Sequence, residues 1–350
     1  MTTSPELQSR VISLLRFPLM VLVVLIHSRL NGVDGGQAFQ STQFLLSDVL
    51  ASVAVPFFFV ISGYLFFYGK PFTWARYGDK LKRRARTLLV PYVLWILLFA
   101  LLFFVVQNVL TSFSGGTNKH IAQYTAADWL RAFGIGAMPL DAPLWFLRDL
   151  MVTVVLSPII YYGVRLLRWG WIALLAAVYF WGKFDYSNYG LSMVALFYFS
   201  CGATLSLSGR LLTNIPKKIF VPAAFLFLAM LIILGIDCLE DPWKLIAKKV
   251  AWLSEIIVML WAVTRWAGKC PSLRPNKLLL GSTFFLYGFH AVPQQYIISL
   301  YQKGVSAMTT PHCFLLYFGN FIGVIMLSTA CYWLCKRLLP RFASLLTGAR

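Results

Sequence analysis

The sequence predicts an all-α integral membrane protein, a bundle of about ten transmembrane helices. Of its 350 residues, 59% are hydrophobic and only 12% are charged, and the mean hydropathy is +0.73. Apolar runs near the roughly 20 residues needed to cross a bilayer recur along the whole chain. The segments between these runs are too short to fold alone. Residues 1–350 are therefore expected to form a single membrane-embedded domain.

The apolar runs define the expected elements in order along the chain. The first run should be retained in the protein, because it is too long for a cleaved signal peptide and lacks an A-x-A-like end. An amphipathic piece near residues 126–133 is expected on the outer surface. The ten expected spans cover residues 11–30, 43–68, 87–110, 143–163, 169–183, 190–208, 219–238, 249–267, 278–301 and 313–335.

The distribution of charge predicts the orientation of this bundle. A net charge of +19 would suggest nucleic acid as a partner of a soluble protein. Here most of the 31 Lys and Arg residues fall in alternate connections, on the side that holds both termini. Cytoplasmic loops carry such an excess, so both termini are expected in the cytoplasm and no nucleic acid is expected to bind. The six Cys residues are scattered without zinc-site spacing, and no metal site is expected.

The first span carries two ionisable residues, Arg16 and His27. Such residues are costly at bilayer depth and indicate a functional site. Eleven residues advance close to three full helical turns, so both side chains should leave one face, about 16 Å apart along the axis.

A basic cluster precedes the third span, with Lys82, Arg83 and Arg86 spaced to share a helical face. Guanidinium groups bind phosphate with two parallel hydrogen bonds. Such a cluster can instead serve only to orient the span and to contact lipid headgroups. Its density exceeds what orientation requires, and this favours a phosphate site.

Two further motifs are candidates for a substrate path. Ser62 and Tyr64 lie in a Ser-Gly-Tyr step of the second span, where another helix can approach closely. Trp145 opens the fourth span, beside Arg148 and Asp149. Simple helix packing would explain the first motif, and an interfacial aromatic belt would explain Trp145. The Arg148 and Asp149 pair is either a buried ion pair or part of the rim of the span.

The last part of the chain adds three polar candidates. Tyr287 and His290 follow Thr283 on one face of the ninth span, and a polar stripe on a membrane helix is expected to face the bundle interior. His290 could equally be a hydrogen-bonded structural residue. Glu255 in the eighth span is another buried ionisable group, whose partner the sequence does not reveal.

Taken in order, these motifs resemble acyltransferase family 3. The chain carries R-x10-H in the first span, V-P-x-F-F-x-I-S-G-Y-L-F in the second, a cytoplasmic R-x-x-R-x-L-x-x-P-Y, then L-W-F-L, and finally Y-x-x-H. The resemblance covers about residues 10 to 335. It is closest to the short, single-module members, such as the O-acetyltransferase of enterobacterial common antigen.

The resemblance implies a multi-pass enzyme of the bacterial inner membrane. Such an O-acyltransferase would move an acetyl group from cytosolic acetyl-CoA to a hydroxyl of a cell-surface glycan or lipid-linked saccharide. His27 would be the general base, because neutral imidazole is the usual base near pH 7. Arg16, Lys82, Arg83 and Arg86 would hold the phosphates of the donor, which is a substrate and not a permanent cofactor. An acyl-histidine intermediate on His27 is a variant of this mechanism.

A proton-coupled transporter or exporter of a small molecule or glycan is the alternative. In that case Arg16, His27, Glu255 and His290 would form a substrate and proton relay. A transporter would move substrate without consuming acyl-CoA, and it would depend little on Arg83 and Arg86.

Overall fold

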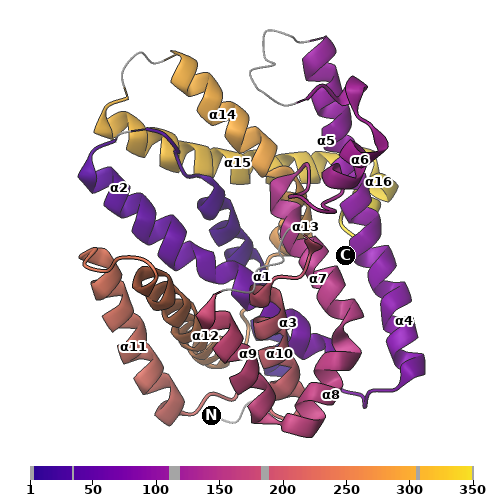
Figure 1. Cartoon of the computed structure of the whole chain (residues 1–350), viewed down its shortest axis with the longest axis vertical. Coiled ribbons are helices and arrows are strands. Elements are labelled where there is room, and N and C mark those ends of the chain that lie inside the picture. Colours follow the sequence, from indigo (N-terminus) through magenta and orange to yellow (C-terminus); the bar gives the residue numbers. More distant parts are fainter. Residues whose placement is uncertain (1–3, 34, 110–118, 183–188, 305–307, 349–350) are drawn as a thin grey trace.

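The computed structural model describes residues 4–33, 35–109, 119–182, 189–304 and 308–348. Throughout these ranges the regular structure is helical and no β-strand occurs, so the all-α prediction is confirmed. The helices form one bundle, with α1 near its centre and α15 running across it (Figure 1).

The helices follow one another with short connections. The first group is α1 (Pro5–His27), α2 (Gln37–Gln43), η1 (Phe44–Leu50), η2 (Ala51–Val53), α3 (Ala54–Phe67), α4 (Trp74–Arg84), η3 (Ala85–Leu89) and α5 (Val90–Asn108). The second group is η5 (Ile121–Gln123), α6 (Ala126–Ala132), η6 (Ala142–Leu144), α7 (Trp145–Val155), α8 (Ser157–Leu167), α9 (Trp169–Trp181) and α10 (Met193–Leu207). The third is α11 (Lys217–Gly235), α12 (Trp243–Lys269), α13 (Lys277–Phe289), α14 (Ala291–Gly304), α15 (Thr310–Leu338) and α16 (Pro340–Leu346).

Five helices of the described chain are long and apolar enough to cross a membrane, and six if the bent pair α7 and α8 is one span. The expected spans at 169–183 and 190–208 coincide with the shorter apolar helices α9 and α10, and only the first part of the span at 278–301 corresponds to the apolar helix α13. Positions 110 and 183, where the third and fifth expected spans end, lie outside the described residues. The total of ten spans stays a prediction.

Two of the expected spans are each divided into two helices. The span at 143–163 bends by 60° between α7 and α8, just before Pro158. The span at 278–301 divides at His290, just before Pro293. Proline cannot donate a backbone hydrogen bond and its ring clashes with the preceding turn, so each break has the same physical cause.

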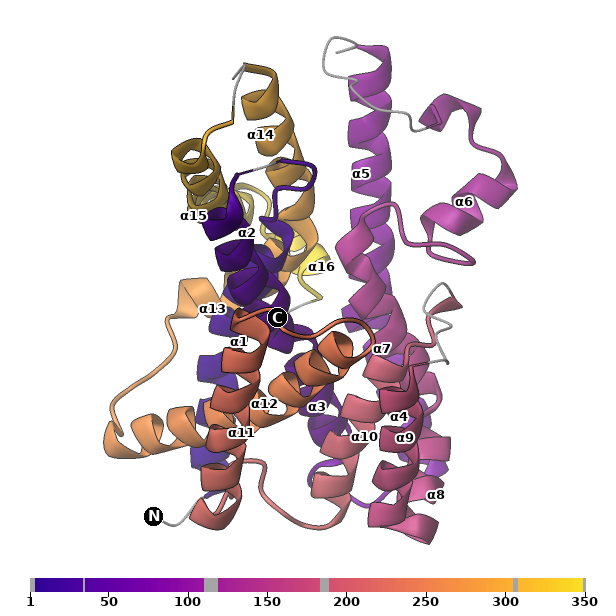
Figure 2. The same cartoon turned by 60° about the vertical axis from the view of Figure 1, so that its left-hand side comes forward.

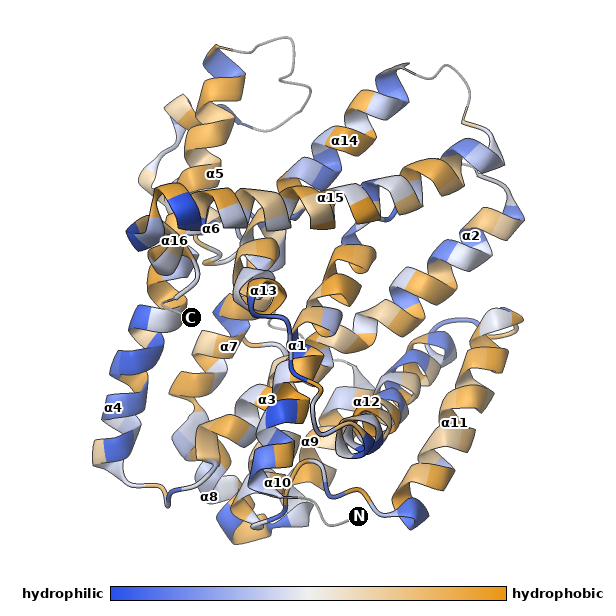
Figure 3. Ribbon diagram, turned by 180° about the vertical axis from the view of Figure 1, so that it is seen from behind, coloured by the Kyte–Doolittle hydropathy of each residue, from blue (hydrophilic) through white to orange (hydrophobic). Residues whose placement is uncertain are grey.

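Two other expected spans contain a wide π-helical turn. The second span continues from α2 through η1 and η2 into α3, and η1 is such a turn. The helix that contains the third expected span begins well before that span, at Trp74, because the basic helix α4 runs through the π-helical η3 into α5. Figure 3 shows that α4 is largely hydrophilic, whereas α5 and α11 are mainly hydrophobic. Wide turns of this kind change which side chains share a face.

The core is densest where α3 crosses α10. A Cβ atom on Gly63 would lie 2.0 Å from the Phe199 carbonyl oxygen, and one on Gly202 would lie 2.0 Å from the Val60 carbonyl oxygen. Small residues let helix backbones approach closely in membranes. The Ser-Gly-Tyr step therefore has the close-packing role that the sequence allowed.

α1 contacts helices from both halves of the chain. It packs against α3, α12, α13 and α15, and its residues Val11, Leu15 and Leu19 are fully buried. The C-terminal helix α16 packs on α5, where the Trp95 indole donates to the Leu346 carbonyl at 3.2 Å. Figure 2 shows α5 and α6 standing beside the bundle that surrounds α1.

The expected amphipathic segment is present as α6. Thr125 and Asp128 form a reciprocal capping box at its first turn. Hydrogen bonds from Lys119 and Thr125 hold the pKa of the Asp128 carboxyl well below its usual range. Asp128 therefore remains charged and keeps this cap at neutral pH.

The close packing at Gly63 and Gly202 predicts that replacing either glycine by alanine destabilises the protein. We expect Gly63→Ala and Gly202→Ala each to lower the free energy of unfolding by about 1 to 3 kcal/mol, because each added methyl group overlaps a carbonyl oxygen. The measurement is the midpoint of thermal unfolding in detergent. Gly319→Ala is the matched control, since nothing lies within 4 Å of its added Cβ. Equal midpoints for Gly63→Ala and Gly319→Ala would contradict this account.

Candidate functional site

Two histidines from distant parts of the sequence meet near the end of α1. His27 is the last residue of α1, and His290 lies between α13 and α14. Their ring centroids are 5.1 Å apart with the planes inclined by 57°. His27 is half-buried, whereas His290 is completely buried. The pair thus has one member that is open to a neighbouring pocket and one that is enclosed.

The hydrogen bonds of His290 determine its tautomer. Its Nδ1 lies 3.0 Å from the Leu286 carbonyl oxygen and 2.9 Å from the Tyr287 carbonyl oxygen. Carbonyl oxygens only accept, so Nδ1 must carry the hydrogen. The other ring nitrogen, Nε2, is buried and has no hydrogen-bond partner within the part of the chain that the structure describes. In the neutral ring it is a proton acceptor.

His27 forms part of the wall of a polar pocket of about 370 Å³ between the end of α1 and α14. Clefts of this size commonly hold small-molecule ligands. Amide, hydroxyl and guanidinium groups line most of the pocket. Its other lining residues are Ile26, Arg29, Asn31, Gln295, Ile298, Ser299 and Gln302.

A buried glutamine joins α14 to the last turn of α1. The Gln294 amide donates to the Val24 carbonyl at 3.0 Å and to the Ser28 hydroxyl at 2.8 Å. Ser28 in turn donates to the Val24 carbonyl at 3.0 Å. All of these groups are fully buried, so the bonds are shielded from water and hold His27 and His290 in a constant relation.

A second group of ionisable residues includes Arg16, which is on the same helix as His27. Arg16 is exposed, and its charge acts on the half-buried Arg84, which also feels Arg83. No ion pair neutralises Arg16, Arg84 or Arg83 among the described residues. Like charges held together without acidic partners favour an anionic ligand such as a phosphate.

The identity of the basic residues at this site differs in part from the sequence-based expectation. Lys82, Arg83 and Arg86 are all exposed, and the π-helical η3 begins between Arg83 and Arg86. The α-helical spacing that placed these side chains on one face does not apply across this turn. Arg84, which that spacing passed over, is the one that interacts with Arg16.

Arg148 and Asp149 form a buried ion pair, which settles the alternative left by the sequence. Arg148 Nε donates to Asp149 Oδ1 at 3.0 Å, and both residues are buried. Arg148 Nη1 also donates to the carbonyls of Gly134 and Ala137, at 2.8 and 2.9 Å. The pair therefore attaches the segment after α6 to the first turn of α7.

Tyr287 links η6, the short helix just before α7, to the histidines. Its hydroxyl donates to the Pro143 carbonyl at 2.6 Å, and its ring centroid lies 6.5 Å from that of His290. Trp145 is half-buried and packs against the main core. The L-W-F-L and Y-x-x-H motifs are thus brought together with the end of α1.

The other candidates for the substrate path lie elsewhere. Tyr64 is hydrogen-bonded to Gln8 near the start of α1, about 28 Å along the helix axis from His27. Ser62 is half-buried on α3. Glu255 is buried on α12, and in the described residues its Oε2 atom has no hydrogen-bond partner. Nor does the described chain bring three His, Cys, Asp or Glu side chains together as a metal ion would require.

Sequence reasoning missed the polar residues that line the pocket. Gln295, Ser299 and Gln302 are spaced four and three residues apart on α14 and could have been recognised as a stripe. Arg29 and Asn31 follow α1 in a connecting segment, where no periodicity indicates which way a side chain points.

Comparison with known proteins identifies the family. A family model described as an acyltransferase domain matches residues 10–340. The chain belongs to acyltransferase family 3. It is also similar to the succinoglycan biosynthesis protein ExoH of Rhizobium meliloti (strain 1021), with 29% identity over 314 residues, covering 87% of this chain and 81% of that protein. No solved structure matches. The protein is thus a membrane acyltransferase of a family with a member in polysaccharide synthesis.

The buried ion pair of this acyltransferase predicts a large effect on stability. We expect Arg148→Gln to lower the free energy of unfolding by about 3 to 5 kcal/mol, because it removes the buried ion-pair partner of Asp149. Arg165→Gln is the control, since Arg165 is exposed and its bond to the Tyr161 hydroxyl is on the surface. Thermal unfolding in detergent compares the two. Similar midpoints would show that the pair does not hold α7 in place.

Proposed function

We propose that this chain is an O-acyltransferase that moves an acetyl group from cytosolic acetyl-CoA to a hydroxyl of a cell-surface glycan or lipid-linked saccharide. The observation that carries the proposal is the position of His27, which faces a polar pocket on one side and the buried His290 on the other. The name of the relative ExoH, which refers to succinoglycan biosynthesis, supports a saccharide as the acceptor.

The donor would bind near Arg16, at the middle of α1 and about three turns from His27. Arg16 and Arg84, with the neighbouring Lys82, Arg83 and Arg86, supply positive charges for the phosphates of acetyl-CoA. The pantetheine arm would extend along α1 toward His27, over the roughly 16 Å that separate the two residues. Acetyl-CoA is a substrate here, and no permanently bound cofactor takes part.

His27 would act as the general base. A ring nitrogen of His27 takes the proton of the acceptor hydroxyl as its oxygen attacks the thioester carbonyl. The carbon–sulfur bond then breaks, and the CoA thiolate recovers that proton from the imidazolium. Acceptor and donor thus become acyl ester and free CoA, with no other reactant. His290 would orient His27 across their ring contact.

The proposal places the protein in the bacterial inner membrane with ten spans and both termini in the cytoplasm. The excess of Lys and Arg near Arg16, in α4 and after α15 supports this orientation. The donor site would then face the cytosol, and the pocket at the end of α1 would face outward.

If His27 is the general base, its removal should slow acyl transfer but leave the binding of acetyl-CoA intact. We expect His27→Ala to reduce the transfer rate by about 10²- to 10⁴-fold, as is typical on removal of a general base. Alkali-released acid from the surface glycan, identified by mass, measures transfer and identifies the acyl group. His120→Ala, at an exposed histidine outside the site, is the control. Full transfer by a folded His27→Ala variant would contradict the mechanism.

The donor site predicts a separate effect on acyl-CoA binding. We expect Arg16→Gln and Arg84→Gln each to weaken CoA binding by about tenfold or more, because each removes a charged hydrogen-bond donor. Titration calorimetry of the purified protein with CoA measures this. Arg274→Gln is the control, since Arg274 is exposed and bonds to the carbonyl of Pro271. Unchanged CoA affinity in both variants would exclude this donor site, and substrate flux without acyl-CoA consumption would favour a transporter.

A further inference from the structure

We infer that the pocket beside His27 binds one sugar unit of the acceptor, and that amide side chains on two facing walls determine its specificity. The inference rests on the proposed function and deepens it, because it assigns acceptor-binding residues. One wall is the segment after α1, with Arg29 and Asn31, and the other is α14, with Gln295, Ser299 and Gln302.

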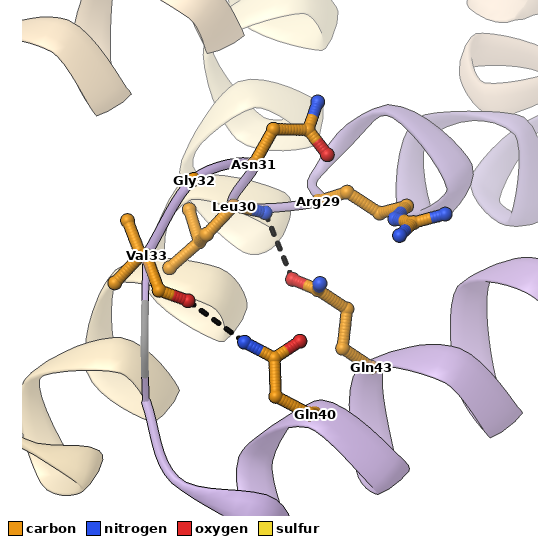
Figure 4. A pocket seen from close by; sticks show the side chains of 7 residues that line it. All are labelled: Arg29, Leu30, Asn31, Gly32, Val33, Gln40 and Gln43. Carbon is orange, nitrogen blue, oxygen red and sulfur yellow. Dashed lines mark hydrogen bonds between the residues drawn. The ribbon is translucent and has the colours of Figure 1, made fainter.

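The segment after α1 is held rigidly by two glutamines of α2. The Leu30 amide donates to Gln43 Oε1 at 2.8 Å, and Gln40 Nε2 donates to the Val33 carbonyl at 2.7 Å. Figure 4 shows both glutamines reaching this segment from α2, while the side chain of Asn31 points to the opposite side. A binding wall that is already ordered loses little conformational entropy when a ligand binds.

Asn31 and Arg29 belong to two adjacent hollows of the surface. One, of about 410 Å³, lies over α2, and the other is the pocket that contains His27. The two hollows together give an extended cleft, as a chain of sugars would require. His27 lies in only one of them, so a single sugar unit would reach the base.

The facing wall on α14 presents a polar stripe. Gln295, Ser299 and Gln302 follow the four- and three-residue spacing of one helical face. No hydrogen bond within the described chain engages the side-chain amides of Asn31, Gln295 or Gln302. These groups are therefore available to a ligand.

The chemistry of this lining matches hydroxyl groups better than phosphates. An amide both donates and accepts hydrogen bonds, as does each hydroxyl of a sugar ring. The pocket contains one guanidinium, that of Arg29, and it is already paired with Asp48 on η1. The Arg16 and Arg84 cluster, in contrast, has no ion-pair partner among the described residues. The pocket is thus suited to the neutral acceptor and the cluster to the anionic donor.

The test separates the affinity for acceptor from the affinity for donor. Purified protein is assayed for transfer from radiolabelled acetyl-CoA to the deacylated surface-glycan fraction of cells that lack this gene, at varied concentrations of that fraction. We expect Asn31→Ala and Gln302→Ala each to raise the KM for the glycan fraction by several fold, and the double variant by about tenfold, as expected for the loss of two neutral hydrogen bonds. The KM for acetyl-CoA and the CoA affinity should stay within about twofold of wild type.

Gln37→Ala is the matched control, because Gln37 is an exposed glutamine of α2 that lines neither hollow. The inference is overturned if both single variants keep the wild-type KM for the glycan fraction, or if both lose CoA binding, since the two sites would then not be separate. Failure of the proposed function would look different: the wild-type protein would neither bind CoA nor transfer label. Retained CoA affinity also shows that each variant is folded.

Discussion

The contact between the last turn of α1 and the junction of α13 with α14 is the interaction on which the site depends. Gln294 donates to Val24 and Ser28, and His290 lies against His27 one helical turn away. Inside a membrane bundle little water is available to replace a lost hydrogen bond, so breaking one of these buried bonds would be costly. The position of His27 therefore depends on α1, α13 and α14 together and not on α1 alone.

The break before Pro293 makes this contact possible. A continuous helix over 278–301 would place Gln295 about 140° around the helix axis from His290. In the structure, α13 ends at Phe289, His290 bonds to the carbonyls of Leu286 and Tyr287, and α14 starts in a new helix. The buried Tyr287 and His290 lie up to the break, and the polar stripe of Gln295, Ser299 and Gln302 lies after it on α14. The break at Pro293 thus separates the histidine proposed to orient the base from the side chains proposed to bind the acceptor.

The middle of α1, at Arg16, and the segment just after the helix have different electrostatic character, and this difference divides the proposed site. Arg16 lies among cations without ion-pair partners in the described chain, whereas Arg29, just beyond His27, is paired with Asp48. Positive charges without acidic partners attract the phosphates of a donor, whereas a guanidinium that is already paired, together with side-chain amides, favours the neutral hydroxyls of an acceptor. The close approach at Gly63 and Gly202 packs α3 against α10 in the core.

The sequence by itself determined the helical membrane class, the placement of Arg16 and His27 on one helix and the family, because these follow from apolar run length, from spacing within one helix and from motif order. The wide turn at η3 that favours Arg84 over its neighbours was not predicted. The break at His290 was not predicted either, although Pro293, its local cause, is visible in the sequence. Only the tertiary structure brought Arg29 and Asn31 opposite Gln295 and Gln302. Such contacts join residues far apart in the chain, and local periodicity contains no information about them.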